Sequence, residues 1–399
     1  MKRFWFLLVA AIGAMSPAAR AQVNCSSSST KLICLIPNQL NLSPGSSQSL
    51  AFLNEAVGSQ VSELPVATPA SGIIYTNDPK LNLPVPSNET LGPVLTQRAE
   101  TIGRHKVYIA FTYQYFLLQD IDGLSLKNLP IFLPLQTGTA VTATNNRLDL
   151  KANQFTGYVT YGLTGRIDLS VAVPVLDVHE QFTSSGVEFS LVPPFGSATF
   201  NNISKAGEVT GVGDVTLAIK GRVWKPRHGG FSLGAEVRLP SGDALNFLGA
   251  GTIGFRPFGT LTYGGRFSPH FNIAYEVNGS TDLITNSQGG KGQLPNRLLY
   301  SGGADWGVTK WLTLAADVLE QRVFDAQRIK LINFSISNPN LTFPSISPFK
   351  DSYNRTDGSA GVKIKPFGNL IITGNVVVKL DHAGLRSRLV PLVGASYTF

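Results

Sequence analysis

The sequence predicts an all-β protein: a transmembrane antiparallel up-and-down β-barrel of about 12 strands, or about 14, preceded by an irregular N-terminal extension. Three observations favour this class: an export signal at the start, few charged residues, and long segments in which apolar and polar residues alternate. Charged residues make up 15% of the chain, against about 25% in soluble globular proteins. Beyond the first residues, no segment reaches the run of about 18 apolar residues expected of a membrane-spanning helix. The composition therefore favours a chain in which every second side chain faces lipid.

Residues 1–21 have the pattern of a cleaved secretory signal peptide. Lys2 and Arg3 precede an apolar run from Phe4 to Met15, and small residues follow at Ala19 and Ala21. The run is too short and wrongly flanked for a transmembrane helix. We therefore expect export to the bacterial outer membrane.

Residues 22–100 are rich in Ser, Pro and Asn and show no sustained period. Repeated prolines predict irregular structure, which leaves two alternatives: a periplasmic extension, or a plug that folds into the barrel lumen. Cys25 and Cys34 are the only cysteines. In an oxidising periplasm we expect them to form a disulfide, and with no further ligands nearby we expect no metal site.

Residues 101–399 show a recurring period of two, which is typical of strands with one apolar face. Val107, Ile109 and Phe111, for example, alternate with polar or small residues. The segments are longer than most soluble strands and match the length that crosses lipid at a tilt. The predicted strands are 105–118, 146–161, 165–178, 209–224, 230–239, 252–264, 268–278, 296–306, 311–323, 353–365, 368–380 and 387–399.

Connections between these strands alternate between short and long. The short turns are 162–164, 225–229, 265–267, 307–310 and 366–367. The long connections are 119–145, 179–208, 279–295 and 324–352, with shorter links at 240–251 and 381–386. Outer-membrane barrels place short turns in the periplasm and longer loops outside, so this alternation favours a barrel over a soluble sandwich.

The last residues resemble the C-terminal signal of bacterial outer-membrane barrels. Gly394, Tyr397 and Phe399 lie in the final predicted strand, and the last residue is aromatic. We expect them to be read by the barrel-assembly machinery. Tyr113, Tyr115, Trp306, Tyr397 and Phe399 are further expected to face outer-membrane lipid as part of an aromatic girdle.

The face opposite the lipid stripe is predicted to line the lumen. Its charged residues include both signs, so the side chains either pair across neighbouring strands or line a wet path with a small cationic bias. Four aromatic residues fall on the same face and would suit a hydrophobic ligand. The candidate lumen-lining residues are Lys220, Arg222, Glu236, Arg238, Arg256, Lys363, Lys379, Arg388, Tyr108, Phe116, Tyr158 and Phe258.

Three glycine-rich motifs carry a family resemblance: Gly211-Val-Gly213-Asp214-Val-Thr-Leu, then Val237-Arg238-Leu239-Pro240-Ser241-Gly242-Asp243, then Ser268-Pro269-His270-Phe-Asn272-Ile-Ala-Tyr275. This stretch resembles the outer-membrane transporters labelled "putative meta-pathway of phenol degradation". That group is in turn similar to long-chain fatty-acid and aromatic-hydrocarbon channels. The resemblance implies transport of small hydrophobic or aromatic solutes. We expect Leu239–Asp243 to shape a turn rather than to contact substrate.

The sequence does not indicate an enzyme. The five histidines are widely separated, and neither an H-E-x-x-H nor a G-x-S-x-G motif occurs. No cofactor is expected. The formal charge is +8, yet no run of Lys and Arg exists, so nucleic acid is not an expected partner.

The predicted function is an outer-membrane channel for passive uptake or efflux of small hydrophobic or aromatic compounds. Two alternatives remain open. One is a structural or surface-interaction barrel with a sealed lumen, and the other is a general anion-preferring porin.

Overall fold

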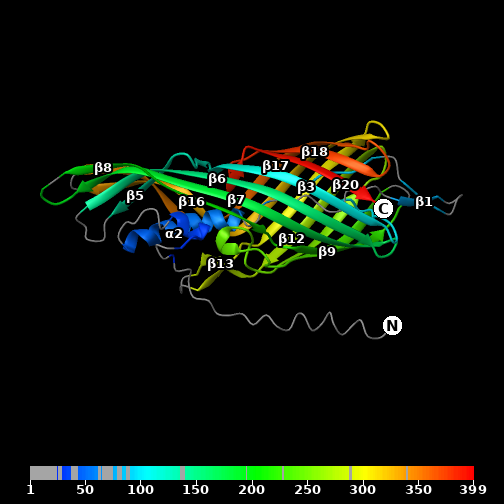
Figure 1. Ribbon diagram of the computed structural model, residues 1–399, viewed down its shortest axis with the longest axis horizontal. Helices are drawn as coiled ribbons and strands as arrows, with labels where there is room; N and C mark the ends of the chain where they lie inside the picture. The colour runs from blue at the N-terminus through cyan, green and yellow to red at the C-terminus, as the bar shows by residue number, and fades with distance from the viewer. Residues whose placement is uncertain are drawn as a thin grey trace.

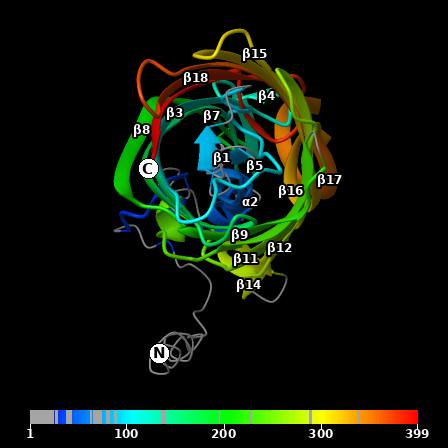
Figure 2. The same cartoon turned by 90° about the vertical axis from the view of Figure 1, so that its right-hand side faces the viewer.

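The computed structural model describes residues 25, 29–36, 44–61, 64, 75–78, 83–86, 90–134, 140–194, 196–226, 229–286, 290–337 and 340–399. The expected signal peptide, residues 1–21, lies outside the described residues. Figure 1 shows a long molecule in which the strands run obliquely along its length. Figure 2, turned by 90°, shows the same strands as a ring.

Twelve antiparallel strands form a closed barrel. The ring closes because β3 pairs with both β6 and β20, which lie at opposite ends of the strand order. This confirms the predicted fold class and the count of twelve. The barrel strands are β3 (Val107–Ile121), β6 (Ala140–Gly162), β7 (Ile167–Ser190), β9 (Thr216–Trp224), β10 (Gly230–Arg238), β11 (Gly254–Thr262), β12 (Phe267–Asn278), β15 (Arg297–Gly307), β16 (Leu312–Ser337), β17 (Asn340–Ile364), β18 (Leu370–Lys379) and β20 (Leu389–Thr398).

Alternating residues on each strand point to opposite sides of the wall. On β11, Leu261 is 48% exposed whereas its neighbours Thr260 and Thr262 are buried. On β3, Phe111 is exposed and Tyr108 and Phe116 are buried. The outer surface is thus an apolar belt and the inner face is largely polar, the pattern of a membrane-spanning barrel.

The two ends of the barrel differ. At one end, here called the turn end, six short segments lie before β3 and between successive strand pairs, and the C-terminus lies at this end (Figure 1). At the other, the extended end, β6, β7, β16 and β17 continue well beyond the closed ring (Figure 1).

Much of the connection length expected to be loop is therefore strand. β7 pairs with β8 (Ser197–Val212), and β16 pairs with β17 as far as Ser337 and Asn340. These ladders persist because backbone pairing needs no strict alternation of apolar residues. Shorter strands complete this end: β4 (Leu124–Ser125), β5 (Leu129–Pro134), β13 (Ser280–Thr285), β14 (Lys291–Gln293) and β19 (Leu385–Ser387).

The predicted strand 209–224 is two strands. β8 ends at Val212 and β9 begins at Thr216, and both pair with β7. Asp214 lies in the break, where its carboxylate accepts hydrogen bonds from the amides of Gly242 and Ala250, at 3.0 and 2.8 Å. Because these bonds tie the chain to the 239–253 connection, the ladder stops there.

The N-terminal part is not wholly irregular, contrary to the expectation. It contains η1 (Leu32–Cys34), α2 (Pro44–Val61), β1 (Tyr75–Asp78) and β2 (Leu83–Pro86). Pro44 is the first residue of α2, a position where proline is tolerated because no amide donor is needed. Figure 1 shows α2 at the extended end of the molecule, where it contacts β5, β13, β16 and β19. Its buried residues Leu53, Ala56, Val57 and Val61 follow helical spacing and join the same core as the barrel wall.

None of the described helices is long and apolar enough to span a bilayer, an observation that concerns helices alone.

Candidate functional site

The barrel encloses a cavity of about 290 Å³. Residues 95–97 of the N-terminal part line it together with the inward faces of the barrel strands. Of the predicted lumen residues, Tyr158, Phe258, Glu236, Arg238 and Arg256 contact this cavity. Its lining combines aromatic and aliphatic side chains with a group of charged ones.

The charged lining residues pair with one another. Arg256 Nε donates to Glu236 Oε2 at 2.8 Å, and Arg297 Nη2 donates to Glu276 Oε2 at 2.7 Å. Arg238 Nη1 lies 3.4 Å from Glu276 Oε1. These residues belong to β10, β11, β12 and β15, neighbours in the wall. Their charges stabilise one another across the strands rather than facing an open path unopposed.

A second charged group joins β17 to the segment before β20. Arg386 Nη2 lies 2.9 Å from Asp357 Oδ1, and Arg355 Nε donates to Asp357 Oδ2 at 3.0 Å. Lys379 pairs with Asp120. Arg388, also predicted to line the lumen, is exposed where β19 gives way to β20. Arg355 and Asp357 line the cavity, whereas Lys379 and Arg388 do not.

Residues 90–102, here called the strap, run through the barrel interior. Two predicted lumen lysines bind the strap backbone: Lys220 Nζ donates to the carbonyls of Arg98 and Glu100 at 3.0 and 2.8 Å. Lys363 Nζ donates to the carbonyl of Pro93 at 2.5 Å. Both lysines are almost fully buried, and carbonyl oxygens offset part of the cost of burying their charge.

Inward side chains also accept hydrogen bonds from the strap amides. Gln97 N donates to Asn272 Oδ1 at 3.1 Å, and Ala99 N donates to Thr262 Oγ1 at 2.9 Å. Further along, Ile102 N donates to Asp168 Oδ2 at 3.1 Å. The polar inner face of the barrel thus satisfies the backbone of a segment that has no secondary structure of its own.

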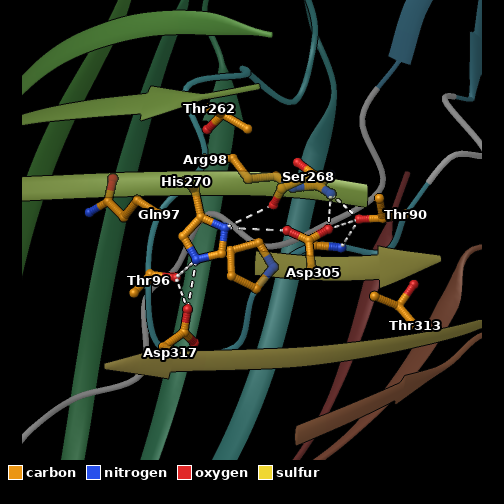
Figure 3. A network of polar contacts seen from close by, with 12 residues as sticks. Thr90, Thr96, Gln97, Arg98, Thr262, Ser268, His270, Asp305, Thr313 and Asp317 are labelled. Atoms are coloured by element: carbon orange, nitrogen blue, oxygen red, sulfur yellow. Dashed lines mark hydrogen bonds and ion pairs between the residues drawn. The ribbon is translucent and has the colours of Figure 1, made fainter. Parts of the chain in front are cut away.

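A buried polar network joins the strap to the wall near the turn end (Figure 3). His270 on β12 lies between two carboxylates, with Nε2 2.6 Å from Asp317 Oδ1 and Nδ1 3.4 Å from Asp305 Oδ1. From the strap, Arg98 Nη2 donates to Asp305 Oδ2 at 2.8 Å and Thr96 Oγ1 donates to Asp317 Oδ1 at 3.1 Å. We call these five residues the latch.

Three further predicted lumen residues do not line the cavity. Tyr108 and Phe116 are buried on the inner face but do not line the large cavity. Arg222 is half-buried and donates to the carbonyl of Gly229 at 2.6 Å.

The structure also describes the predicted C-terminal signal and the two cysteines near the N-terminus. In β20, Gly394 and Tyr397 pair with Thr112 and Ile109 of β3, and Phe399 follows the strand. Tyr397 and Phe399 are exposed on the outer surface, their rings 4.6 Å apart. Cys25 and Cys34 are joined by a disulfide beside η1.

The strap and the latch were not predicted from the sequence. The period of two places His270, Asp305 and Asp317 on the inner face, but it does not show that they contact one another or the strap. No sequence signal marks Thr96 or Arg98, because a strap without secondary structure carries no periodicity.

Two of the three sequence motifs meet at one structural junction. Ser241 Oγ donates to the carbonyl of Gly213 at 2.8 Å, and Asp214 holds the Gly242 amide. A Cβ on Gly242 would lie 2.4 Å from the carbonyl oxygen of Leu248. The motif glycine is thus needed for close approach, and the 239–243 motif shapes the connection between β10 and β11. The third motif contributes His270 to the latch.

No group of three or more His, Cys, Asp or Glu residues able to hold a metal ion occurs in the part of the chain that the structure describes.

Several solved structures are similar to this chain in arrangement. One is an outer-membrane channel from Pseudomonas putida F1, with 14% identity and a TM-score of 0.43, over 75% of this chain and 98% of that one. Another is the toluene transporter TbuX from Ralstonia pickettii, with 12% identity and a TM-score of 0.28, over 74% and 90%. A third is a Pseudomonas aeruginosa FadL homologue, with 10% identity and a TM-score of 0.30, over 82% and 94%.

No curated protein matches the sequence. Residues 134–316 match the protein family described as "Putative MetA-pathway of phenol degradation". This range contains all three glycine-rich motifs and extends from the end of β5 into β16. The resemblance predicted from the motifs is therefore confirmed: residues 134–316 of this barrel are similar to that family.

Proposed function

We propose that this chain is an outer-membrane channel that lets small hydrophobic compounds cross passively, with the lumen cavity as a station on the route. The single observation that carries the proposal is the cavity of about 290 Å³ inside a closed transmembrane barrel. Small-ligand sites are typically concave, mostly apolar and supplied with a few polar groups.

The lining supports an uncharged solute. Tyr158, Phe258, Leu95, Leu176 and Leu299 supply aromatic and aliphatic contacts around the space. The arginines and glutamates of the lining pair with each other, so they need no ionic solute to balance them. A solute that brings apolar surface gains by burying it here, whereas an ion would have to compete with pairs already formed.

The strap supports a route that is narrow rather than freely open. Residues 95–97 form part of the cavity lining, and the latch holds the neighbouring strap residues on the turn-end side. We propose that the strap acts as an internal plug and that a solute passes when the strap shifts. Of the two alternatives for residues 22–100, a periplasmic extension and a lumen plug, we thus propose the plug.

The test fills the cavity with one side chain. Ala172 lies on the inner face beside Tyr158 and lines the cavity, so Ala172→Phe should obstruct it. Ala316→Phe is the matched control, because Ala316 is exposed on the outer face. Cells expressing each variant are supplied with the hydrophobic dye N-phenyl-1-naphthylamine, and its initial uptake rate is measured. We expect Ala172→Phe to lower the rate several-fold and Ala316→Phe to leave it unchanged.

A polar solute distinguishes the alternatives. The uptake rate of arabinose is measured in the same cells. If the protein speeds arabinose uptake as much as dye uptake, and Ala172→Phe lowers both rates, a general porin is favoured over a hydrophobic channel. If cells with the unaltered, folded protein take up neither solute faster than cells without it, the channel proposal is wrong. A sealed structural barrel would then be favoured.

A further inference from the structure

The connections at the turn end have an unusual charge. Six short segments lie there, namely 103–106, 163–166, 225–229, 263–266, 308–311 and 365–369. Every one of them contains Lys or Arg, and none contains Asp or Glu. We call their described cations the turn rim: Arg104, Lys106, Arg166, Lys225, Arg266, Lys310 and Lys365.

The turn rim is available to a partner. Arg104, Arg166, Lys225, Arg266 and Lys310 are exposed. Arg266 donates to the carbonyls of Gly307 and Val308 at 2.8 and 2.6 Å, which are neutral acceptors and leave its charge uncompensated. Within the described chain, Arg166, Lys225 and Lys310 form no ion pair. The rim thus places exposed positive charge on five of the six segments.

Exposed aromatic side chains flank the same cations in the sequence. Trp224 precedes Lys225, and Trp311 follows Lys310; their exposed fractions are 58% and 53%. Tyr263 and Phe267 flank the Gly-Gly-Arg266 turn at 61% each, and Phe367 follows Lys365 at 70%. Aromatic rings with exposed surface at a strand end belong at the headgroup level of a bilayer. The cations therefore lie where lipid phosphates lie.

The extended end has no such bias. Its described residues include Asp120, Asp122, Asp243, Asp282, Asp325, Asp351 and Asp381 as well as Lys127, Lys291, Arg328, Lys330, Lys350 and Arg388. Several of these pair, as Lys291 does with Asp282 and Arg328 with Asp122. The positive bias is thus a property of one end of the barrel and does not follow from the net charge of the chain.

We propose that the turn rim binds the headgroups of anionic phospholipids in the leaflet that it faces. Lys and Arg near a membrane surface attract anionic lipid, and their amino and guanidinium groups donate charge-assisted hydrogen bonds to phosphate oxygens. The flanking rings hold the rim at headgroup depth. This inference rests on the barrel alone and is independent of what passes through the lumen.

Tryptophan fluorescence reports on the rim directly. The four tryptophans are Trp5, Trp224, Trp306 and Trp311, and the last three lie at the turn end. The full chain carrying Trp5→Phe is placed in vesicles of phosphatidylcholine with increasing fractions of brominated phosphatidylglycerol, or of brominated phosphatidylcholine. Bromine quenches the nearby indoles, so the two curves give the relative binding of the two lipids at the rim.

We expect phosphatidylglycerol to bind several-fold more strongly than phosphatidylcholine, with the preference falling as salt is added. The variant Arg166→Gln, Lys225→Gln, Lys310→Gln should lose most of it. The matched control Lys127→Gln, Lys330→Gln, Lys350→Gln removes as many exposed cations from the extended end and should keep it. Folding of each variant is checked by its heat-dependent gel mobility. Equal quenching by both lipids in the parent protein, or an unchanged preference in the folded rim variant, would overturn the proposal.

Discussion

Gly303 shows how one missing side chain allows the latch to form. In the wall it pairs with His270 of β12 on one side and with Asp317 of β16 on the other. The contact of 2.6 Å between His270 and Asp317 therefore crosses over Gly303. A Cβ at this position would lie 2.2 Å from Asp317 Oδ1 and 2.4 Å from the carbonyl oxygen of Ala316. Since one of these atoms is backbone, the strand itself would have to move.

Gly303→Ala should therefore destabilise the folded barrel by about 1–3 kcal/mol, the usual cost of overpacking a tight site. Gly302→Ala is the control, because the nearest atom to a Cβ there is a Phe271 ring carbon at 3.9 Å. The free energy of unfolding in urea, measured for both variants in the same vesicles, checks the prediction. Equal stability of the two variants would contradict it.

At the scale of elements, η1 is held to the β10–β11 connection. Lys31 Nζ lies 2.6 Å from Asp243 Oδ2, and the amide of Leu32 donates to Asn246 Oδ1 at 3.2 Å. Asp243 also accepts from the amide of Leu245, which begins η2 (Ala244–Asn246). Partial burial would raise the pKa of Asp243, but the hydrogen bond and charge of Lys31 outweigh it and lower that pKa below 3.8.

A lowered pKa means that the folded state favours the ionised carboxylate. The stabilisation is thus present above pH 3.8 and is lost as the pH falls through the folded pKa. Since both side chains are partly exposed, we expect less than about 1 kcal/mol. Hydrogen exchange of residues 31–36 should accelerate below pH 3.8.

Asp243→Asn keeps a capping side chain and should remove most of this pH dependence. Asp351→Asn, at an exposed carboxylate, should leave it intact. Equal pH dependence in the parent and Asp243→Asn would show that another group is responsible.

The elements differ in how far the sequence predicts them. Strand β12 (Phe267–Asn278) was predicted within one residue because Phe271, Ile273, Tyr275 and Val277 alternate with polar residues. α2 was missed because its apolar residues are few among Ser, Gln, Asn and Gly, and its packing against β13 and β16 stabilises it. The break between β8 and β9 was missed because Asp214 bonds a connection far along the chain.

At the scale of the whole molecule, buried side chains join the strap to the barrel wall. The Arg98 side chain is 6% exposed and its partner Asp305 is fully buried. Removing one member of a buried ion pair costs about 3–5 kcal/mol, because the other charge loses a counter-ion. Arg98→Met should therefore loosen the strap while leaving the strands of the wall paired.

Single-channel conductance in planar bilayers checks this prediction. We expect Arg98→Met to conduct more, or to open more often, than the parent protein. Arg322→Met is the control, since Arg322 is exposed and donates to Asn354 Oδ1 at 2.9 Å. If Arg98→Met conducts no more than the parent protein, the strap does not obstruct the lumen.

The sequence predicts which wall residues face inward, but it does not predict which residues of the strap they bind. The period of two placed Lys220, Lys363 and Glu236 on one face of the wall, and that parity is local information. Nothing local shows that both lysines bind strap carbonyls or that Gln97 donates to Glu236. Those contacts join residues more than a hundred positions apart.

The sequence by itself determined the strand pattern, the twelve-strand barrel and the family resemblance, because each of these is written in residues close together in the chain. Only the tertiary structure decided that α2 packs at the extended end, that the strap runs through the ring, and that His270 meets Asp305 and Asp317 there. The physical reason is closure: once the sheet pairs with itself, its inner face encloses the strap and hydrogen-bonds residues that lie far away in the chain.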